Sequence, residues 1–242
     1  MNVLIVYAHQ EPKSFCGALL LFGLETLKEG GHEVKVSDLY AMKFNPVCDR
    51  NDFLEVADPD YFKVQKEQSH ATSQRSFAQD IAQEQEKVEW ADIVIFHQPL
   101  WWFSIPAITK GWFDRVLALG FAYGGGRWFD KGVFRGKKAM LTITAGAPES
   151  RYQEGHIFGG IDRVLYPLHV GLFNFVGFDI LEPFITWAPV QLSAEGRETE
   201  LRRYQSRLAS LASEATLPFH SLEQHPDPMD GLNSYVAPRP NP

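Results

Sequence analysis

The chain has little of several features that mark common classes of protein. Its 242 residues include only two cysteines, Cys16 and Cys48, which have no metal-binding spacing and are too few for a disulfide framework. No apolar run reaches membrane-spanning length, and residues 1–8 are too short for a secretory signal. The net charge of −7 is spread without a basic patch, so we expect neither nucleic acid nor an anionic membrane surface as a partner. These absences favour a cytoplasmic protein.

What the chain does have is an alternation of apolar runs of strand length with helical patterns, which is typical of an α/β fold. Strands are predicted at 2–8, 33–37, 91–97 and 138–144, and helices at 75–90, 106–119 and 201–211. The apolar content of 45% is enough for one substantial core, so we expect a single domain over residues 1–217. Residues 218–242 have few apolar side chains, which predicts an extended C-terminal tail.

The loop at 9–16 follows the first predicted strand and leads into a helix. Ser14 is a natural N-cap for that helix, which leaves the backbone N–H groups of Phe15 and Cys16 as unpaired donors at its positive end. Such an end binds phosphate, and His9 can add a hydrogen bond. An ordinary strand-to-helix turn has the same pattern. The loop lacks G-x-G-x-x-G and the P-loop motif, which argues against a dinucleotide Rossmann turn or a P-loop here.

Two further loops follow predicted strands. The loop at 98–107 holds Trp101, Trp102 and Phe103 between prolines, and three aromatic side chains in a connection are typical of a wall for a flat ligand such as an isoalloxazine. A hydrophobic cluster beneath a long loop is the alternative. In the loop at 144–152, small residues allow the backbone to approach a ring edge, and Tyr152 supplies a phenol. Three such loops at the carboxyl ends of parallel strands together predict a flavin site.

Several longer stretches match one known family. They are residues 3–15, 36–42, 91–96, 99–116 and 120–123, with the motifs at 130–132, 166–167 and 177–178. In these stretches the chain resembles the NAD(P)H:quinone oxidoreductases, the flavodoxin-like family that includes the DT-diaphorase type. The resemblance covers residues 1–190 and implies an α/β flavodoxin-like fold, with a five-stranded parallel sheet of order 2-1-3-4-5 and helices on both faces. It also implies an FAD-binding homodimer with its active site at the subunit interface.

The resemblance implies an activity and particular site residues. Such enzymes pass a hydride from NAD(P)H to flavin N5 and then reduce a quinone by two electrons, in a ping-pong sequence. The expected cofactor-binding residues are His9, Ser14, Phe15, Cys16, Pro99, Leu100, Trp101, Trp102, Phe103, Thr144, Ala145, Gly146 and Tyr152, with Asp114 reaching the adenine end of FAD from the neighbouring subunit. The expected substrate-binding residues are Phe103, Tyr123, Gly125 and Phe175.

The chain departs from the family pattern at several of these positions. Mammalian members have a histidine six residues beyond the tyrosine, where this chain has Phe158. His156 lies four residues beyond Tyr152 and can take the catalytic partner role if the loop is rearranged, or it can be a surface histidine. Cys16 replaces an asparagine. Gly125 stands where the family has a second tyrosine, so we expect a more open rim and a preference for larger quinones.

Other readings remain open. One branch of the family binds a metal through two histidines, but this chain has Val170 and Asn174 there, so we expect no metal. Relatives of the family serve as regulatory flavoprotein subunits of potassium-efflux systems, which is one alternative function. An FMN-dependent azoreductase or nitroreductase is another. The sequence does not distinguish among NADH, NADPH and a smaller nicotinamide donor, and it leaves the physiological acceptor open.

Overall fold

A computed structural model describes residues 1–218 and 221–222. Its parallel sheet has the order β2-β1-β3-β4-β5, which confirms the predicted order, and a sixth strand also pairs with β4. The strands are β1 (Asn2–Tyr7), β2 (Glu33–Asp38), β3 (Ile93–Pro99), β4 (Lys138–Ala145), β5 (Asp179–Ile180) and β6 (Phe184–Trp187). The last two pair with opposite ends of β4, so the fifth position of the sheet is filled in two pieces. Pro183 lies between them, where it has no N–H to give to the sheet.

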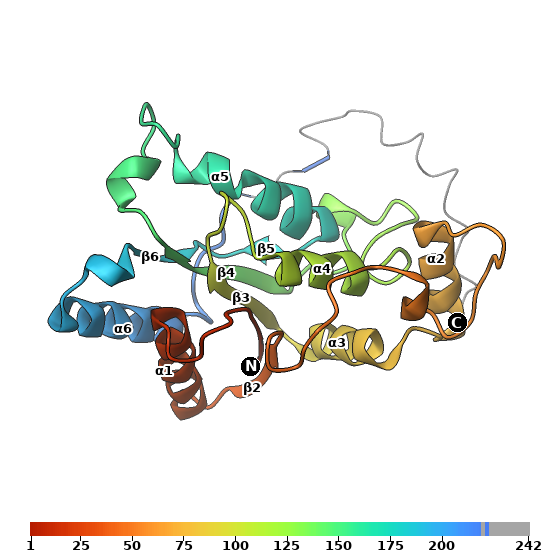
Figure 1. Cartoon of the computed structure of the whole chain (residues 1–242), viewed down its shortest axis with the longest axis horizontal. Helices are drawn as coiled ribbons and strands as arrows, with labels where there is room; N and C mark the ends of the chain where they lie inside the picture. The colour runs from red at the N-terminus through yellow and green to blue at the C-terminus, as the bar shows by residue number, and fades with distance from the viewer. Residues whose placement is uncertain (219–220, 223–242) are drawn as a thin grey trace.

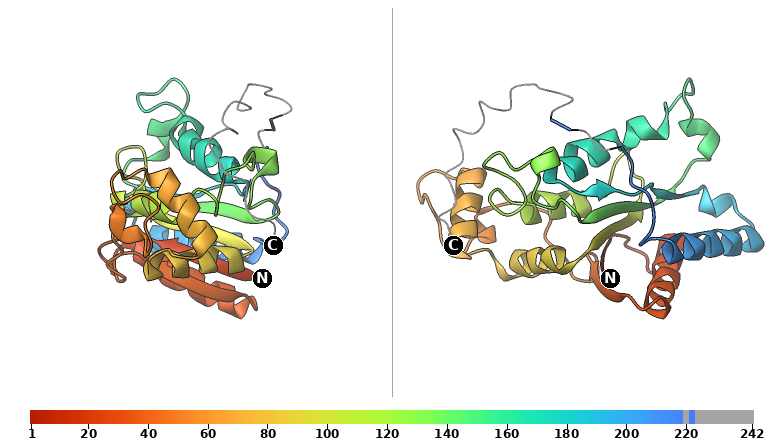
Figure 2. Two further views of the ribbon diagram at one scale, coloured as in Figure 1. Left: turned by 90° about the vertical axis from the view of Figure 1, so that its right-hand side faces the viewer. Right: turned by 180° about the vertical axis from the view of Figure 1, so that it is seen from behind.

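Helices cover both faces of the sheet (Figure 1). On one face, α1 (Phe15–Glu29) and α6 (Ala194–Ala209) lie side by side, as the view from behind in Figure 2 shows. The other face carries α3 (Gln79–Trp90), α4 (Ala107–Val116), α5 (Ile161–Leu168) and the π-helix η4 (His169–Asn174). Alternate side chains of β1 enter the two cores, because a strand presents successive residues to opposite faces. The continuous apolar runs of the sequence are explained by this double burial.

The remaining helices are short or lie at the edge of the fold. They are α2 (Val64–Gln74), η1 (Arg50–Asp52), η2 (Phe129–Lys131), η3 (Glu149–Tyr152) and η5 (Pro189–Gln191). Residues 43–74 show no clear period in sequence because α2 is polar and packs at one end of the molecule (Figure 1). No helix among the described residues combines the length and apolarity needed to cross a membrane.

After α6, the chain returns along the edge of the sheet. Leu181 and Thr216 form an antiparallel bridge, and the Leu217 N–H donates to the Ile180 carbonyl at 2.7 Å. The predicted boundary at residue 217 therefore falls where the chain is still paired with the sheet. Most of the predicted tail, residues 219–220 and 223–242, lies outside the described residues, so its extended form stays a prediction.

A histidine is fully buried at the carboxyl end of β3. His97 packs edge-on against Tyr7 and Tyr204, with ring centroids 5.5 Å and 6.0 Å away. Burial lowers its pKa from 6.5 to about 3, because a charged imidazole loses its hydration there. The ring is therefore neutral in the native protein at neutral pH.

This burial predicts a loss of stability in acid. The native pKa lies below the unfolded value, so as the pH falls the unfolded chain takes up the proton first. The contribution is complete above about pH 6.5 and is lost as the pH falls towards about 3, by up to about 1.4 kcal/mol per pH unit. The free energy of unfolding, measured with denaturant between pH 7 and pH 4, should change less steeply with pH in His97→Gln than in the wild type. Burial also lowers the pKa of His169, to about 4, so some slope will remain. Equal slopes in the two proteins would contradict the assignment to His97.

Candidate functional site

Three loops begin side by side at the carboxyl edge of the sheet. The Ala8 N–H donates to the His97 carbonyl at 3.0 Å, which aligns the end of β1 with that of β3. The Leu100 N–H donates to the Thr144 carbonyl at 2.9 Å, which aligns the end of β3 with that of β4. The loops that leave these strands therefore share one edge, as the parallel sheet predicted.

The first loop presents the open N-terminus of α1. Ser14 caps the helix, because its Oγ accepts from the Gly17 N–H at 3.1 Å. The first turn contains no acidic side chain, so the N–H groups of Phe15 and Cys16 remain available to an anion. A side chain at Gly17 would lie 2.1 Å from the Pro12 carbonyl oxygen, so glycine is what allows the loop to close over the helix.

The polar side chains of this loop fit the same ligand class. The Glu11 N–H donates to His9 Nδ1 at 3.0 Å, so the neutral ring carries its proton on Nε2, where it can donate to a ligand. Burial lowers the pKa of His9, which favours that neutral form. Burial also raises the pKa of the Cys16 thiol to about 12, so it stays protonated beside Thr144.

The second loop holds two aromatic side chains in a strained turn. Trp101 and Ser104 exchange backbone hydrogen bonds of 3.0 Å and 2.9 Å, and the two residues between them have left-handed backbones, with φ of 52° at Trp102 and 56° at Phe103. Aromatic residues rarely adopt this conformation, which raises the energy by roughly 1–3 kcal/mol at each position. The turn leaves Trp102 96% exposed and Phe103 half-exposed. A flat apolar surface is therefore offered to a ligand.

The third loop brings a phenol to the same edge. Tyr152, on η3, is nearly buried, and its ring contacts Phe103, Phe158 and Trp187 at centroid distances of 6.2 Å, 5.1 Å and 5.0 Å. Burial raises the pKa of its hydroxyl, which is protonated at neutral pH. A side chain at Gly146 would meet open space, so the backbone there is accessible.

His156 does not join the aromatic contacts of Tyr152 in this conformation. Its side chain is exposed, and its backbone lies in the turn between Gln153 and Gly159. Phe158 occupies the side of Tyr152 instead. A partnership between Tyr152 and His156 therefore stays a prediction, and it requires the loop to move.

The remaining predicted residues gather elsewhere. Asp114, Tyr123 and Phe175 line a cavity of about 470 Å³ between α2, α4 and η4. The Tyr123 and Phe175 rings lie 5.7 Å apart. In Figure 1, α2 is at the right-hand end of the molecule, whereas the segment after β4 is at the left-hand end. One chain therefore separates the predicted site residues into two groups. The loop set comprises the residues in the loops at 9–16, 98–107 and 144–152, and the cavity set comprises Asp114, Tyr123 and Phe175.

The loop beside Tyr123 is shaped by glycine. Gly124, Gly125 and Gly126 all have positive φ, and a side chain at Gly125 would meet open space. The Arg127 guanidinium donates to the carbonyls of Gly120 and Gly124 at 2.9 Å and 3.0 Å, and so holds the segment that carries Tyr123. Arg127 was not among the predicted site residues, although an arginine directly after three glycines is a signal that the sequence contains.

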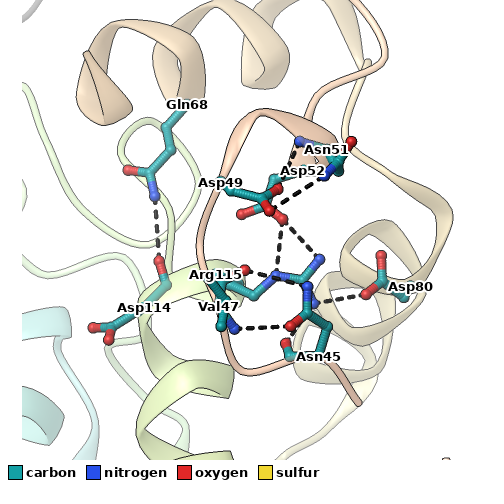
Figure 3. Close-up of polar contacts among 9 residues, drawn as sticks. All are labelled: Asn45, Val47, Asp49, Asn51, Asp52, Gln68, Asp80, Asp114 and Arg115. Carbon is teal, nitrogen blue, oxygen red and sulfur yellow. Dashed lines mark hydrogen bonds and ion pairs between the residues drawn. The ribbon is translucent and has the colours of Figure 1, made fainter. Parts of the chain in front are cut away.

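A buried arginine supports the cavity (Figure 3). Arg115 donates to Asp52 at 2.9 Å, to Asp80 at 2.7 Å and to the Asn45 carbonyl at 2.9 Å. It thereby ties α4 to the segment after β2 and to the start of α3. Next to it, the Gln68 side chain donates to the Asp114 carbonyl at 3.3 Å. This network leaves no local pattern in the sequence, because its members lie up to 70 residues apart.

Within residues 1–218 and 221–222, no group of three or more histidine, cysteine, aspartate or glutamate side chains is arranged to hold a metal ion. This observation adds no support for a metal site, and the expectation of no metal stays a prediction.

Comparisons with known proteins define the class first. A family model described as a flavodoxin-like fold matches residues 1–208. Ribosyldihydronicotinamide dehydrogenase (quinone) of Homo sapiens is 43% identical over 218 residues, which are 90% of this chain and 94% of that protein. NAD(P)H dehydrogenase (quinone) 1 of Rattus norvegicus is 42% identical over 219 residues, which are 90% of this chain and 80% of that protein.

A solved structure gives the same answer. A Klebsiella pneumoniae protein provisionally assigned as a quinone reductase has a TM-score of 0.88 and 40% identity, and the match covers 91% of this chain and 88% of that one. The chain belongs to the NAD(P)H:quinone oxidoreductase family of flavodoxin-like proteins, which confirms the resemblance seen in the sequence.

The buried position of Arg115 predicts a large effect of its removal. Arg115→Met leaves Asp52 buried without its charged partner, and we expect the free energy of unfolding to fall by about 3–5 kcal/mol. Asp114→Asn is the matched control on the same helix, because its ion pair with Lys110 is exposed and is worth about 1 kcal/mol or less. Denaturant unfolding of both variants measures the difference. Similar losses in the two variants would contradict a structural role for the Arg115 network.

Proposed function

We propose that this chain is an FAD-dependent NAD(P)H:quinone oxidoreductase that transfers a hydride from reduced nicotinamide to a quinone in two steps. The observation that carries the proposal is the strained turn at Trp102 and Phe103, which holds a large aromatic surface in water beside the open end of α1. Exposing that surface is unfavourable unless a flat ligand covers it. An anionic tail at α1 and a flat ring at the turn describe a flavin nucleotide.

The residues present fit a flavin. Phe15, Cys16 and His9 would hold its phosphates with N–H donors, and Trp102 and Phe103 would cover its ring. Gly146 and the backbone of the third loop leave room for a ring edge. When bound, the flavin would supply the hydride acceptor and donor, which no side chain of the protein can provide.

Tyr152 would supply a proton-bearing group. Its hydroxyl is protonated at neutral pH, and it makes no hydrogen bond to the other described residues. It is therefore free to donate to negative charge that develops in the site, which is a common form of transition-state stabilisation. His156 would join it only after the loop at 146–160 moves.

Two chains would be needed for one complete site. The loop set covers the flavin ring, whereas the cavity set with Asp114, Tyr123 and Phe175 lies towards the other end of the same molecule. A homodimer in which each chain gives its cavity set to the partner's loops would unite them. The acidic Asp114 would then face the adenine end of FAD, and Tyr123 and Phe175 would form the wall over the substrate.

The flavin itself is the first test. We expect protein purified without added cofactor to release FAD on heat denaturation, identified by chromatography of the supernatant. FMN alone would favour the azoreductase or nitroreductase alternative and would contradict the proposed role of Asp114. FAD without diaphorase turnover, together with binding to a potassium-efflux transporter, would favour the regulatory alternative.

Tyr152→Phe tests the proposed donor. We expect flavin reduction by NAD(P)H, followed by stopped-flow absorbance, to slow about 10-fold or more because one charge-stabilising hydrogen bond is lost. If His156 acts through Tyr152, adding His156→Ala to Tyr152→Phe will slow reduction no further. An unchanged rate in Tyr152→Phe would remove the tyrosine from the mechanism, and multiplying effects would show that the two residues act independently.

Mixed dimers test the two-chain site. Trp102→Ala and Tyr123→Ala damage opposite halves, so a mixed dimer contains one intact site and one site with both defects. We expect co-expressed, doubly tagged mixed dimers to reduce a quinone at about half the wild-type rate, above either homodimeric variant. Activity no higher than the mean of the two variants would mean that both residues serve a site within one chain.

A further inference from the structure

Among the described residues, several buried polar side chains have atoms without a hydrogen-bond partner, and three of these side chains lie close in sequence to members of a ring cluster on the face of the sheet that carries α4 and α5. They are the Gln98 amide, the Thr109 hydroxyl and His169 Nε2. Each side chain is at least nine-tenths buried. Unpaired buried polar groups are unfavourable, so native proteins seldom keep three of them close together without a partner.

The packing around them shows that they lie together. Phe96 of β3, Phe113 of α4 and Phe173 of η4 contact one another, with ring centroids 4.8–6.1 Å apart. These three rings give a common reference point on the strand and on the two helices. Both helices run antiparallel to β3, as in any crossover that returns the chain from the carboxyl edge of a parallel sheet.

Relative to the phenylalanine on the same element, each polar residue is displaced toward the carboxyl edge of the sheet. Gln98 is two residues beyond Phe96, on the same face of the strand and about 6.6 Å nearer the carboxyl edge. Thr109 is four residues before Phe113, on the same side of its helix and about 6 Å nearer that edge. His169 is about one turn before Phe173, and their rings lie 6.3 Å apart. The three polar side chains are therefore expected in one region, on the carboxyl-edge side of the phenylalanine cluster.

We propose that Gln98, Thr109 and His169 enclose an internal water-binding site at the root of the loop that carries Trp102 and Phe103. The three groups supply both donors and acceptors, and a buried water needs two to four polar partners. His169 is neutral at neutral pH because burial lowers its pKa to about 4, so it adds a hydrogen bond without a charge. Gln98 and Thr109 lie at the two ends of the loop, so a water bonded to both links these ends and thereby stabilises the strained turn.

A double-mutant cycle on the purified full-length protein tests the site. Gln98→Met and Thr109→Val are close in volume to the native residues. Each alone should lower the melting temperature by about 2–8 °C at fixed protein concentration, because the remaining groups lose a partner. The double variant should lose clearly less than the sum of the two, since apolar groups then face one another. Thr109→Val with His169→Leu gives a second cycle if Gln98→Met does not fold.

The control is Thr186→Val. Its buried hydroxyl is also without a partner, but Thr186 lies on β6, where its side chain points to the opposite face from Ile185, which belongs to the α4 and α5 core. Combined with Thr109→Val, its effect should be additive. Additive effects in both test cycles would overturn the proposal. So would a high-resolution crystal structure in which the three groups bond only to other protein atoms.

The link to the loop rests on the proposed function and has its own readout. Thr109→Val should speed release of the bound flavin about 2- to 10-fold, the effect of one lost hydrogen bond, and Thr186→Val should not change it. Non-additive effects on the melting temperature, together with an unchanged rate of flavin release, would support the water site but overturn its proposed role in stabilising the loop. If the protein binds no flavin, the proposed function fails, while the cycles still decide whether the site exists.

Discussion

The pairing of β1, β3 and β4 in one parallel register is the constraint on which the site depends. Because Ala8, Leu100 and their partners are joined by backbone hydrogen bonds, three loops from distant parts of the sequence begin at one edge. The register follows from strands that are buried on both faces and cannot slip without moving side chains out of the core. A phosphate-binding helix end, an aromatic wall and a tyrosine are brought together as a result.

The turn that follows β3 is an exception to this regular structure. The turn at Trp102 and Phe103 combines left-handed backbones with exposed aromatic rings, and each of these is unfavourable for a chain in water. Such conflicts persist only where the surroundings fix them. Here the turn is closed by two hydrogen bonds between Trp101 and Ser104, and it lies between the buried strand β3 and the helix α4. The strain is consistent with a surface prepared for its ligand before binding.

Much of the fold was visible in the sequence, for physical reasons. The strands β1, β3 and β4 are continuous apolar runs, and Ser14 is a strong helix cap, so local patterns were enough to place them. The split of the fifth strand was not predicted, because β5 has only two residues and Pro183 interrupts the run. Arg115 was also missed as a structural residue, since a buried ion pair between distant segments leaves no periodic signal.

The candidate site was predicted in part for the same reasons. Its loops could be listed from strand ends, but the left-handed turn could not, because aromatic residues seldom adopt that conformation. The separation of Asp114, Tyr123 and Phe175 from the loops needed the structure, since α4 begins directly after the aromatic loop. Phe158, rather than His156, packs against Tyr152, so a contact between His156 and Tyr152 requires the loop at 146–160 to move.

A crystal structure of the protein with the flavin it carries on purification tests the central claim most directly. The account predicts an isoalloxazine ring against Trp102 and Phe103, its phosphates at the N-terminus of α1, and Tyr123 and Phe175 of a second copy across the ring. A flavin bound away from this turn, or one enclosed by residues of a single chain, would contradict it.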